Sequence, residues 1–562
     1  MNKRLVKRTI LSAFLPCLVF MATFSSTAPS FWDAQPGHDL ITAITEEMTD
    51  TELLGQVFFL GYVGKTPSPE ILNFIKNRNL GGLKIFTRNV STVYQTAGDI
   101  HFMQQASQQT RFKIPMFVAT DQEGGWVLHI RGDVSRTGGN LSLGAAGIPK
   151  DAYTSAFFIG EELKAMGINM NYAPNLDIYS NSDADAVGPR SFSQNPKEVG
   201  LFGVAYLRGM IDSGIIATGK HFPGHGATNL DSHGYLPEIN ISFDTLYERE
   251  LLPYRMAIRE GLPAIMSAHL AFPQITHDKT PATLSKFFLT DVLRGKLGFK
   301  GIVVTDDMEM NGVLLNGNST ATACYKAIMA GADMVLVSHT PAQQEHTWQL
   351  LIGLMKTDPA FRQRVKTSVE RILTLKFSVF RGEKPFPFLP DLPSLSAKIP
   401  APDAPDFFFQ SLCRGSTIVG DNRIPFVQKP EEKVLIAAHY ADFIKEGKIR
   451  YPEADTLLIP WSSLYYATEE EIRLVTQKAA SYDTVIVCLS SLASLDILKR
   501  LERLGNKVIV VSALTPVYLK DTPWVKSAVA VYGESREAFK IGFAILAGDF
   551  TPEGRLPFDF LD

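Results

Sequence analysis

The stretch GIVVTDD, from Gly301 to Asp307, is a continuous apolar run that ends in two carboxylates. A run without polar alternation is typical of a strand that is buried on both faces of a parallel sheet. Seven more runs of this kind lie between residues 51 and 380: QVFFLG from Gln56, GGLKIF from Gly81, PMFVAT from Pro115, INMNYAP from Ile168, IIATGKHF from Ile215, AIMSAHL from Ala264 and DMVLV from Asp333.

Longer amphipathic stretches, such as residues 151–167 and 199–214, separate these runs and predict helices. Eight strand–helix units in one segment favour an α/β fold of the (β/α)8 TIM-like barrel type. An open doubly wound sheet is the alternative, because periodicity alone does not distinguish the two.

Polar side chains gather where the apolar runs end. They are Asp121, Asn175, Asp177, Lys220, His221, His269 and Asp306. The carboxyl ends of the strands of a barrel form one face, on which such enzymes build their sites. We therefore expect these side chains to converge on a single pocket, which an open sheet would not require.

The amino terminus is typical of an export signal. A basic start with Lys3, Arg4, Lys7 and Arg8 precedes an apolar stretch and the small, polar run SSTAPS. Residues 1–30 are predicted to be a cleaved signal peptide, because Pro16 interrupts the apolar stretch and leaves it short for a bilayer span. The mature protein is expected outside a bacterial cytoplasm, in the periplasm, at the cell surface or secreted, without stable membrane insertion.

A second domain follows the predicted barrel of residues 31–383. Residues 384–405 hold seven prolines and predict a stiff, extended connector. Residues 406–562 show four more strand-like runs, KVLIAAHY from Lys433, DTVIVCLS from Asp483, KVIVVSAL from Lys507 and AVAVYG from Ala528. They predict a smaller, doubly wound α/β sandwich domain, and the lack of a GxGxxG or P-loop motif argues against a nucleotide site there.

Composition excludes several classes of protein. Lys and Arg number 55 against 58 Asp and Glu, a net charge of −3 that gives no electrostatic footprint for nucleic acid. The four cysteines are far apart and show no CxxC spacing, which argues against a disulfide framework and a cysteine-rich zinc site. The oligomeric state is left open.

The densest group of reactive side chains is KHFPGHGATNLDSH, residues 220–233. A metal site would use His221, His225, Asp231 and His233 as ligands and would give a metal-dependent barrel hydrolase. An acid/base site would instead pair Asp231 with His233, so that the free ring nitrogen exchanges a proton with substrate. A third interpretation is that these histidines only hold the loop together by hydrogen bonds.

Two carboxylates follow apolar runs directly. Asp306 is placed where a barrel presents a side chain to its pocket, and can serve as a nucleophile, a metal ligand or an acceptor for hydroxyl groups. Asp307 is expected to point elsewhere and to start a helix. Asp121 opens the run DQEGG and is expected to accept hydrogen bonds from ligand hydroxyls.

These motifs resemble glycoside hydrolase family 3, in its β-N-acetylglucosaminidase branch. The resemblance covers almost the whole mature chain in family order: DQEGG from Asp121, NYAPNLDI from Asn171, RSF from Arg190, KHFPGHG with DSH from Lys220, PATLS from Pro281, LGFKGIVVTDDMEM from Leu297, AGADMVL from Ala330, SVERIL from Ser368 and GDFTPEGRLP from Gly548.

The resemblance implies a retaining glycosidase that needs no cofactor. Asp306 would be the nucleophile, and His233, oriented by Asp231, would be the acid/base in place of the usual second carboxylate. An imidazole suits proton transfer near neutral pH, because its unperturbed pKa is about 6.5. An uncharged acid/base group also tolerates an anionic acceptor, so a glycoside phosphorylase is an alternative.

The resemblance also implies substrate contacts. Asp121, Arg190, Lys220 and His221 match positions that hold the hydroxyl and N-acetyl groups of N-acetylglucosamine. The chain departs from the family where His129 stands at the place of a sugar-binding arginine, with Arg131 two residues later, and where Pro189 precedes Arg190.

We therefore expect an exo-glycosidase that removes terminal β-linked N-acetylglucosamine from glycans or muropeptides, the fragments of peptidoglycan. A broad β-glucosidase or β-hexosaminidase is the alternative within this class. A non-catalytic binder of cell-wall sugars is an alternative outside it, although Asp306, His233 and Asp231 are all present.

Overall fold

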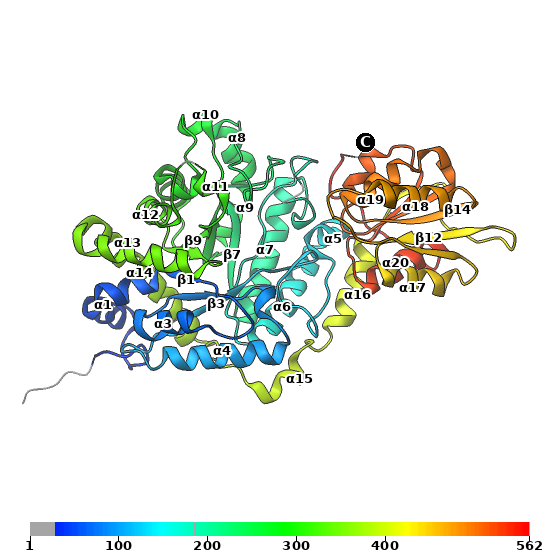
Figure 1. Ribbon diagram of the computed structural model, residues 1–562. Coiled ribbons are helices and arrows are strands. Elements are labelled where there is room, and N and C mark those ends of the chain that lie inside the picture. The colour runs from blue at the N-terminus through cyan, green and yellow to red at the C-terminus, as the bar shows by residue number, and fades with distance from the viewer. Residues whose placement is uncertain (1–27, 185–186, 316, 561–562) are drawn as a thin grey trace, which may run out of the picture.

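A computed structural model of the chain describes residues 28–184, 187–315 and 317–560. The predicted signal peptide, apart from its last three residues, and Cys17 lie outside the described residues. Two domains lie side by side, a barrel and a smaller sheet domain (Figure 1). No helix within the described ranges is long and apolar enough to cross a membrane.

The first domain is a closed barrel of eight parallel strands, in the order β1-β10-β9-β8-β7-β6-β3-β2. All eight predicted runs form its strands: β1 (Phe58–Leu60), β2 (Gly82–Lys84), β3 (Phe117–Thr120), β6 (Met170–Asn171), β7 (Ile216–Phe222), β8 (Ala264–Ser267), β9 (Ile302–Asp307) and β10 (Met334–Val337). The pairing of Phe58 with Val335 joins the first strand to the last. This closure confirms the barrel and excludes the open sheet.

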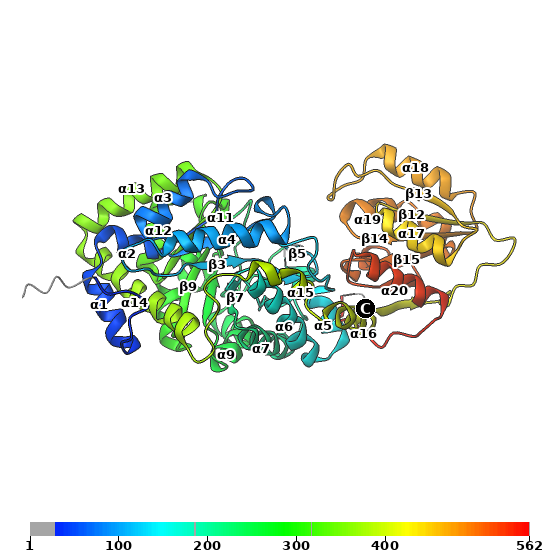
Figure 2. The same cartoon turned by 90° about the horizontal axis from the view of Figure 1, so that it is seen from below.

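Helices surround the barrel and cover the outward-facing apolar residues of its strands (Figure 2). The longer ones are α1 (Gly37–Glu47), α3 (Pro69–Arg78), α4 (Val93–Ser107), α6 (Pro149–Ala165), α7 (Pro196–Ser213), α12 (Thr320–Ala330), α13 (Pro341–Thr357) and α14 (Pro359–Arg381). Shorter ones are α2 (Asp50–Gln56), α5 (Gly139–Ala146), α8 (Phe243–Thr245), α9 (Leu252–Arg259), α10 (Pro273–Thr276) and α11 (Asn311–Leu314).

The proline-rich connector is not simply extended. It contains the 3₁₀ turn Leu392–Ser394 and the short helix α15 (Leu395–Lys398), and it passes below the barrel in Figure 1. Leu395, Ile399 and Ala401 are buried in the barrel's core. The expectation of an extended connector was wrong in this respect, because apolar residues between the prolines gain more by packing against the barrel than by remaining in solvent.

The second domain is a six-stranded sheet in the order β11-β16-β15-β14-β12-β13. The four predicted runs form β12 (Val434–Ala438), β14 (Thr484–Leu489), β15 (Val508–Ser512) and β16 (Ser527–Ala530). The edge strands β11 (Thr417–Asp421) and β13 (Asp455–Leu458) were missed, because they are only partly buried and so lack a continuous apolar run.

Helices cover both faces of this sheet, as a doubly wound domain requires. The helices are α16 (Ala404–Gly415), α17 (Ala441–Arg450), α18 (Glu469–Ala479), α19 (Leu492–Lys499) and α20 (Arg536–Ala547). Ile436 and Ile486 pack with Phe443 of α17 and Phe539 of α20. The alternate strand residues pack with α18 and α19 on the other face.

The two domains share a buried apolar cluster and several hydrogen bonds. Tyr179 and Val187 of the barrel pack with Val517, Tyr532 and Phe558 of the second domain. The backbone N–H of Gln194 and the hydroxyl of Ser193 donate to Pro557 O at 3.0 and 3.1 Å. Residues 179–194 follow β6, so the second domain is anchored to a loop at the carboxyl face of the barrel.

Candidate active site

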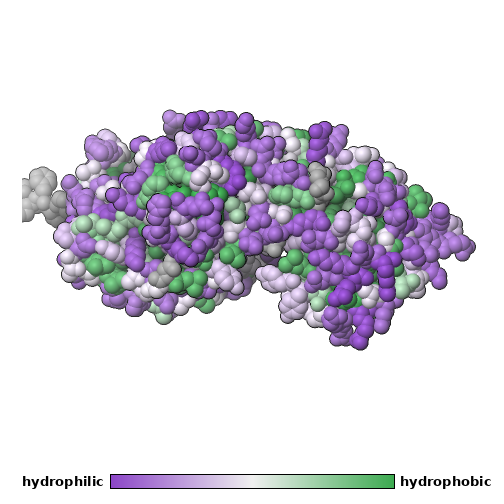
Figure 3. Space-filling view, turned by 90° about the horizontal axis from the view of Figure 1, so that it is seen from above, coloured by the Kyte–Doolittle hydropathy of each residue, from purple (hydrophilic) through white to green (hydrophobic). Residues whose placement is uncertain are grey.

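The charged residues predicted at the strand ends meet at one end of the barrel. Asp121 follows β3, Lys220 and His221 lie in β7, His269 follows β8 and Asp306 lies in β9. The short helices α8 and α10, which come after β7 and β8, mark this end near the top of Figure 1. The space-filling view from above looks onto it and shows the two domains as two adjoining lobes (Figure 3).

Lys220 is the centre of a buried ion network. Its Nζ lies 2.5 Å from Asp121 Oδ1 and 2.6 Å from Glu123 Oε1. Lys84, at the end of β2, pairs with Asp121 Oδ2 at 2.7 Å. Burial alone would raise the pKa of the Asp121 carboxyl, but Lys220 and Lys84 hold it well below its usual range. The carboxylates of Asp121 and Glu123 are therefore charged hydrogen-bond acceptors in fixed positions.

Arg190 joins this network to His221. Its Nε and Nη2 donate to the two carboxylate oxygens of Glu123 at 3.0 and 2.7 Å, a bidentate pair. Its Nη2 also lies 3.2 Å from His221 Nε2. Arg190 and Lys220 neutralise the buried Glu123 carboxylate, and Arg190 reaches the rim of the site from the loop after β6.

His221 is held by a buried carboxylate. Its Nδ1 lies 2.6 Å from Asp177 Oδ2, and the backbone N–H groups of His221 and His225 donate to Asp177 Oδ1 at 3.1 and 2.8 Å. Burial alone would raise the pKa of Asp177, but its interactions with His221 and His225 lower it to about 2. Asp177 thus fixes both the ring of His221 and the turn that follows β7.

His233 and Asp231 form a second His–Asp pair on an exposed loop. His233 Nδ1 lies 2.7 Å from Asp231 Oδ1, and the hydrogen bond raises the pKa of His233. Gly312 N donates to Ser232 O at 3.0 Å and Asn311 N to His233 O at 3.3 Å. These backbone bonds dock the loop onto the segment after β9, the strand that carries Asp306.

Asp306 is partly exposed at the end of β9. The backbone N–H of Asp307 donates to its Oδ1 at 2.8 Å. Burial alone would raise the pKa of the Asp306 carboxyl, but His269, Lys84 and this backbone N–H lower it below the usual value. An ionised carboxylate open to a ligand can act as a nucleophile. Asp307 points to another side, where it bonds to the hydroxyl of Ser338.

The structure places the other predicted site residues in different surroundings. His129 joins the network, with Nε2 3.4 Å from Asp121 Oδ2. Arg131 is exposed, bonds through Nε to Leu128 O at 3.2 Å, and lines a pocket between the domains rather than the Asp121 network. The alternative metal site is not assembled, since no group of three or more His, Cys, Asp or Glu side chains among the described residues is arranged to hold an ion.

Sequence reasoning missed Lys84 and Glu123 as site residues. Lys84 is the last residue of β2 but lies inside the run GGLKIF, before Ile85 and Phe86, so the rule that selected Asp121 and Asp306 does not select it. Glu123 lies two residues after Asp121, in the hairpin formed by β4 (Gln122–Gly124) and β5 (Val127–Leu128). No signal in the sequence showed that this carboxylate would meet Arg190 and Lys220, because both lie more than sixty residues away.

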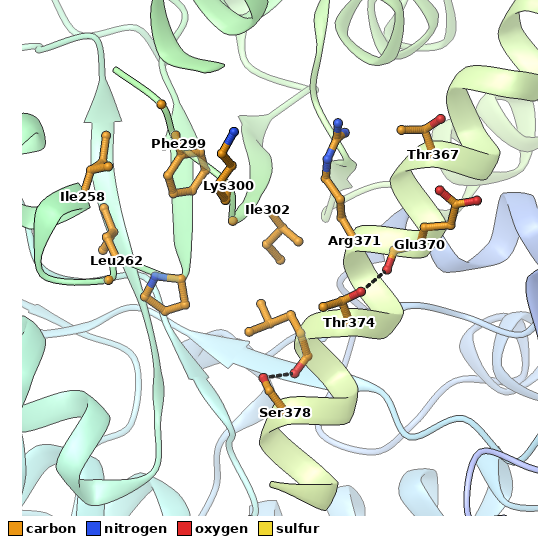
Figure 4. Close-up of a pocket in the computed structure, with 15 residues that line it drawn as sticks. Ile258, Leu262, Phe299, Lys300, Ile302, Thr367, Glu370, Arg371, Thr374 and Ser378 are labelled. Carbon is orange, nitrogen blue, oxygen red and sulfur yellow. Dashed lines mark hydrogen bonds between the residues drawn. The ribbon is translucent and has the colours of Figure 1, made fainter. Parts of the chain in front are cut away.

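A hollow of about 660 Å³ lies at the opposite end of the barrel from these residues (Figure 4). Leu262, Phe299 and Lys300, which precede β8 and β9, line it together with Arg371 and Thr374 of α14. Catalytic residues of barrel enzymes lie at the carboxyl ends of the strands, so this hollow is not the candidate active site.

Comparison with known proteins agrees with the motifs. The model of the glycosyl hydrolase family 3 N-terminal domain matches residues 49–375. Beta-hexosaminidase A of Pseudoalteromonas piscicida is 33% identical over 373 residues, 60% of this chain and 62% of that relative. A beta-hexosaminidase of Methylococcus capsulatus is 35% identical over 283 residues, 50% of this chain and 81% of that relative.

Among solved structures, a family 3 β-N-acetylglucosaminidase from Paenibacillus sp. str. FPU-7 is similar over both domains. It is 29% identical, with a TM-score of 0.81, and the match covers 91% of this chain and 99% of that one. The family model covers more than half of the chain and coincides with the barrel that carries the charged network. The chain belongs to glycoside hydrolase family 3.

Proposed function

We propose that this protein is a retaining exo-glycosidase that hydrolyses terminal, non-reducing, β-linked N-acetylglucosamine. The relatives named beta-hexosaminidase support this activity, as does the likeness to the Paenibacillus β-N-acetylglucosaminidase. The observation that carries the mechanism is the docking of the His233 loop onto the segment that follows Asp306. It brings a proton-transfer group and an ionised carboxylate to the same end of the barrel.

In the first step, Asp306 attacks the anomeric carbon of the sugar. A bond forms between this carbon and a carboxylate oxygen, and the glycosidic bond breaks through an oxocarbenium-like transition state. His233, in its protonated form, gives its proton to the leaving oxygen. The lowered pKa of Asp306 keeps the nucleophile ionised while the raised pKa of His233 keeps the acid protonated.

In the second step, water releases the sugar from Asp306. His233 is now neutral and takes a proton from the attacking water, whose oxygen bonds to the anomeric carbon as the ester bond to Asp306 breaks. Asp231 stabilises the protonated ring and fixes its orientation through Nδ1. The anomeric configuration is retained because the anomeric carbon undergoes two successive substitutions, each with inversion.

The buried network is suited to hold the sugar before either step. Asp121 is a charged acceptor for hydroxyl groups, and Lys220, Arg190 and His221 lie next to it along β7 and the loop after β6. Their ion pairs fix their positions before the ligand arrives, so little reorganisation is needed on binding. His129 takes part at the edge through its contact with Asp121.

The substrates proposed are muropeptides, fragments of peptidoglycan in which N-acetylglucosamine precedes N-acetylmuramic acid. Export to the periplasm, the cell surface or the medium would bring the enzyme to such fragments. The basic start and apolar stretch of residues 1–30 support export. Release of N-acetylglucosamine from purified muropeptides, together with cell fractionation, tests both statements.

The first test of the activity compares the 4-nitrophenyl β-glycosides of N-acetylglucosamine and glucose. We expect turnover of the N-acetylglucosaminide to dominate, with retention of configuration by NMR. Asp306→Ala should lower kcat by about 10³-fold or more while circular dichroism remains native, because no other group replaces the nucleophile. Dominant turnover of the glucoside, or acceleration by phosphate with release of a sugar phosphate, would contradict the proposal. Loss of activity in EDTA with recovery in zinc would restore the metal hypothesis.

A further inference from the structure

The hollow of about 660 Å³ at the amino end of the barrel has no part in the proposed function. One of its walls is formed by residues that lead into β8 and β9, among them Leu262, Phe299 and Lys300, and the other by Arg371 and Thr374 of α14. In Figure 4, Lys300 and Arg371 extend from the two walls toward the same side of the hollow. Two cations therefore stand beside a hollow that apolar residues line in part.

A group of arginines around one buried carboxylate adjoins Arg371. Asp333, directly before β10, is fully buried. Its carboxylate accepts hydrogen bonds from Arg294 Nη2 at 2.5 Å, Arg364 Nη2 at 3.2 Å and Arg371 Nη1 at 3.0 Å. No other carboxylate of the described residues pairs with these three arginines. Three guanidinium groups thus share one negative charge, and two positive charges have no anionic partner.

These charges repel one another where there is little water to screen them. Burial lowers the pKa of Arg294 and of Arg364, and the charge of Arg371 lowers both further, against the attraction of Asp333. The guanidinium groups nevertheless stay charged, because the pKa of arginine lies above about 12. Arg294 Nε is buried without a hydrogen-bond partner in the described part of the chain. An anion beside Arg371 would relieve the repulsion.

Arg371 and Lys300 have donors available to the hollow. The Arg371 side chain is 32% exposed and bonds to Asp333 through Nη1, while its Nε and Nη2 meet no acceptor among the described residues. The Lys300 ammonium is exposed and pairs with no described carboxylate. Glu370 also lines the hollow, and in Figure 4 its carboxylate lies on the far side of Arg371 from Lys300. Lys300 and the three arginines therefore outnumber the two carboxylates by two charges.

This excess of charge suits a phosphoryl group. A phosphate monoester carries close to two negative charges at neutral pH and has three strong acceptor oxygens. Arginine binds such oxygens through two parallel hydrogen bonds, and lysine binds them as a point charge. The hollow is larger than a phosphate ion needs, and the apolar residues Ile258, Leu262 and Phe299 suit an organic group attached to the phosphate.

We propose that this hollow binds a small phosphate monoester, with the phosphoryl group between Lys300 and Arg371 and the organic group against the apolar wall. The site is at the opposite end of the barrel from Asp306, so the proposal does not rest on the proposed function. A ligand here would join α14 to the segments that precede β8 and β9, and would stabilise the barrel by binding only its folded form.

Isothermal titration calorimetry of the full-length protein with phenyl phosphate tests the site, and inorganic phosphate and phenol serve as the two halves of this probe. Phenyl phosphate should bind once per chain with a Kd of about 1 mM or lower, inorganic phosphate about tenfold more weakly, and phenol not measurably. Saturating N-acetylglucosamine is present throughout, so that the cations of the candidate active site are already occupied.

Three variants assign the binding to the hollow. Lys300→Gln should raise the Kd for phenyl phosphate about tenfold, because one charge-assisted contact is lost. Glu370→Gln should lower the Kd about threefold, because it removes a carboxylate that repels the ligand. Lys366→Gln is the matched control, since Lys366 is also a partly exposed lysine of α14 but does not line the hollow. Circular dichroism should be native in all three.

Each contrary result would overturn the proposal. Absence of phenyl phosphate binding to the wild-type protein would do so directly. The same Kd in Lys300→Gln and Lys366→Gln would show that the phosphate binds elsewhere. Phenol binding as tightly as phenyl phosphate would show that the cations do not hold the ligand. A general loss of structure would weaken binding in both Lys300→Gln and Glu370→Gln, whereas the proposal requires shifts of opposite sign.

Discussion

Two His–Asp pairs with nearly the same geometry lie at the same end of the barrel, in opposite surroundings. His221 and Asp177 are 2.6 Å apart and have side chains that are 9% and 0% exposed. His233 and Asp231 are 2.7 Å apart and are 77% and 56% exposed. Hydrogen-bond length therefore does not distinguish their roles, whereas burial and the partner of the second ring nitrogen do.

The second ring nitrogen differs between the two pairs. His221 Nε2 faces Arg190 at 3.2 Å, and because a guanidinium only donates, this nitrogen accepts and Nδ1 carries the proton bonded to Asp177. His233 lies on an exposed loop, where the Arg190 charge acts against the larger effect of the hydrogen bond to Asp231, which raises the pKa of the ring. The buried pair is therefore suited to positioning, and the exposed pair to proton exchange with substrate.

The largest expected effect is on the exposed pair. His233→Ala should lower kcat/KM by about 10²- to 10⁴-fold on substrates with poor leaving groups, because these need protonation. Aryl glycosides with good leaving groups, such as 2,4-dinitrophenyl, should lose far less. Steady-state kinetics over a series of substrates with different leaving-group pKa values measures this difference. An equal loss of kcat/KM across the series would show that His233 is not the general acid.

The buried pair should affect stability instead. Asp177→Ala removes the acceptor of one side-chain and two backbone hydrogen bonds, and should lower the free energy of unfolding by about 3 kcal/mol. Asp231→Ala is the matched change in the exposed pair and should stay within about 0.5 kcal/mol. Urea denaturation measures both, and similar losses would show that burial does not separate the pairs.

A smaller effect is expected on the pH profile. The hydrogen bond that His233 donates to Asp231 raises the pKa of His233, and the acid step needs the protonated ring, so activity is lost as pH rises through this pKa. Asp231→Asn should move the alkaline limb of kcat/KM to lower pH and reduce the maximum about tenfold. An unchanged alkaline limb would mean that another group sets it.

The smallest effect is expected at the contact between the exposed loop that carries His233 and the buried turn that Asp177 holds. Ser232 Oγ lies 3.3 Å from Nε2 of the buried His225 and links the exposed loop to the turn that Asp177 holds. Ser232→Ala should weaken this link by about 1 kcal/mol, with faster proteolysis of the loop and a slightly higher KM. Asn229→Ala, at an exposed position of the same loop, serves as the control, and identical proteolysis rates in both variants would contradict the link.

Much of this comparison could be predicted from the sequence. Asp231 and His233 are two residues apart, so their pairing depends on the loop alone. The eight apolar runs predicted the barrel because buried parallel strands need continuous apolar residues, and polar residues at their ends predicted the carboxyl face. The edge strands β11 and β13 could not be predicted in this way, because a partly buried strand does not need a continuous run of apolar residues.

The sequence alone therefore determined the barrel, the second α/β domain, the family and the candidate catalytic trio Asp306, His233 and Asp231. The tertiary structure decided which partners the buried charges take: Asp177 meets His221 across 44 residues, and Lys220 meets Asp121 across 99. It also placed Arg131 on the interdomain pocket. The pattern of apolar and polar residues indicates which segments are buried. Ion pairs between distant residues depend instead on the strand order and on the packing of the two domains.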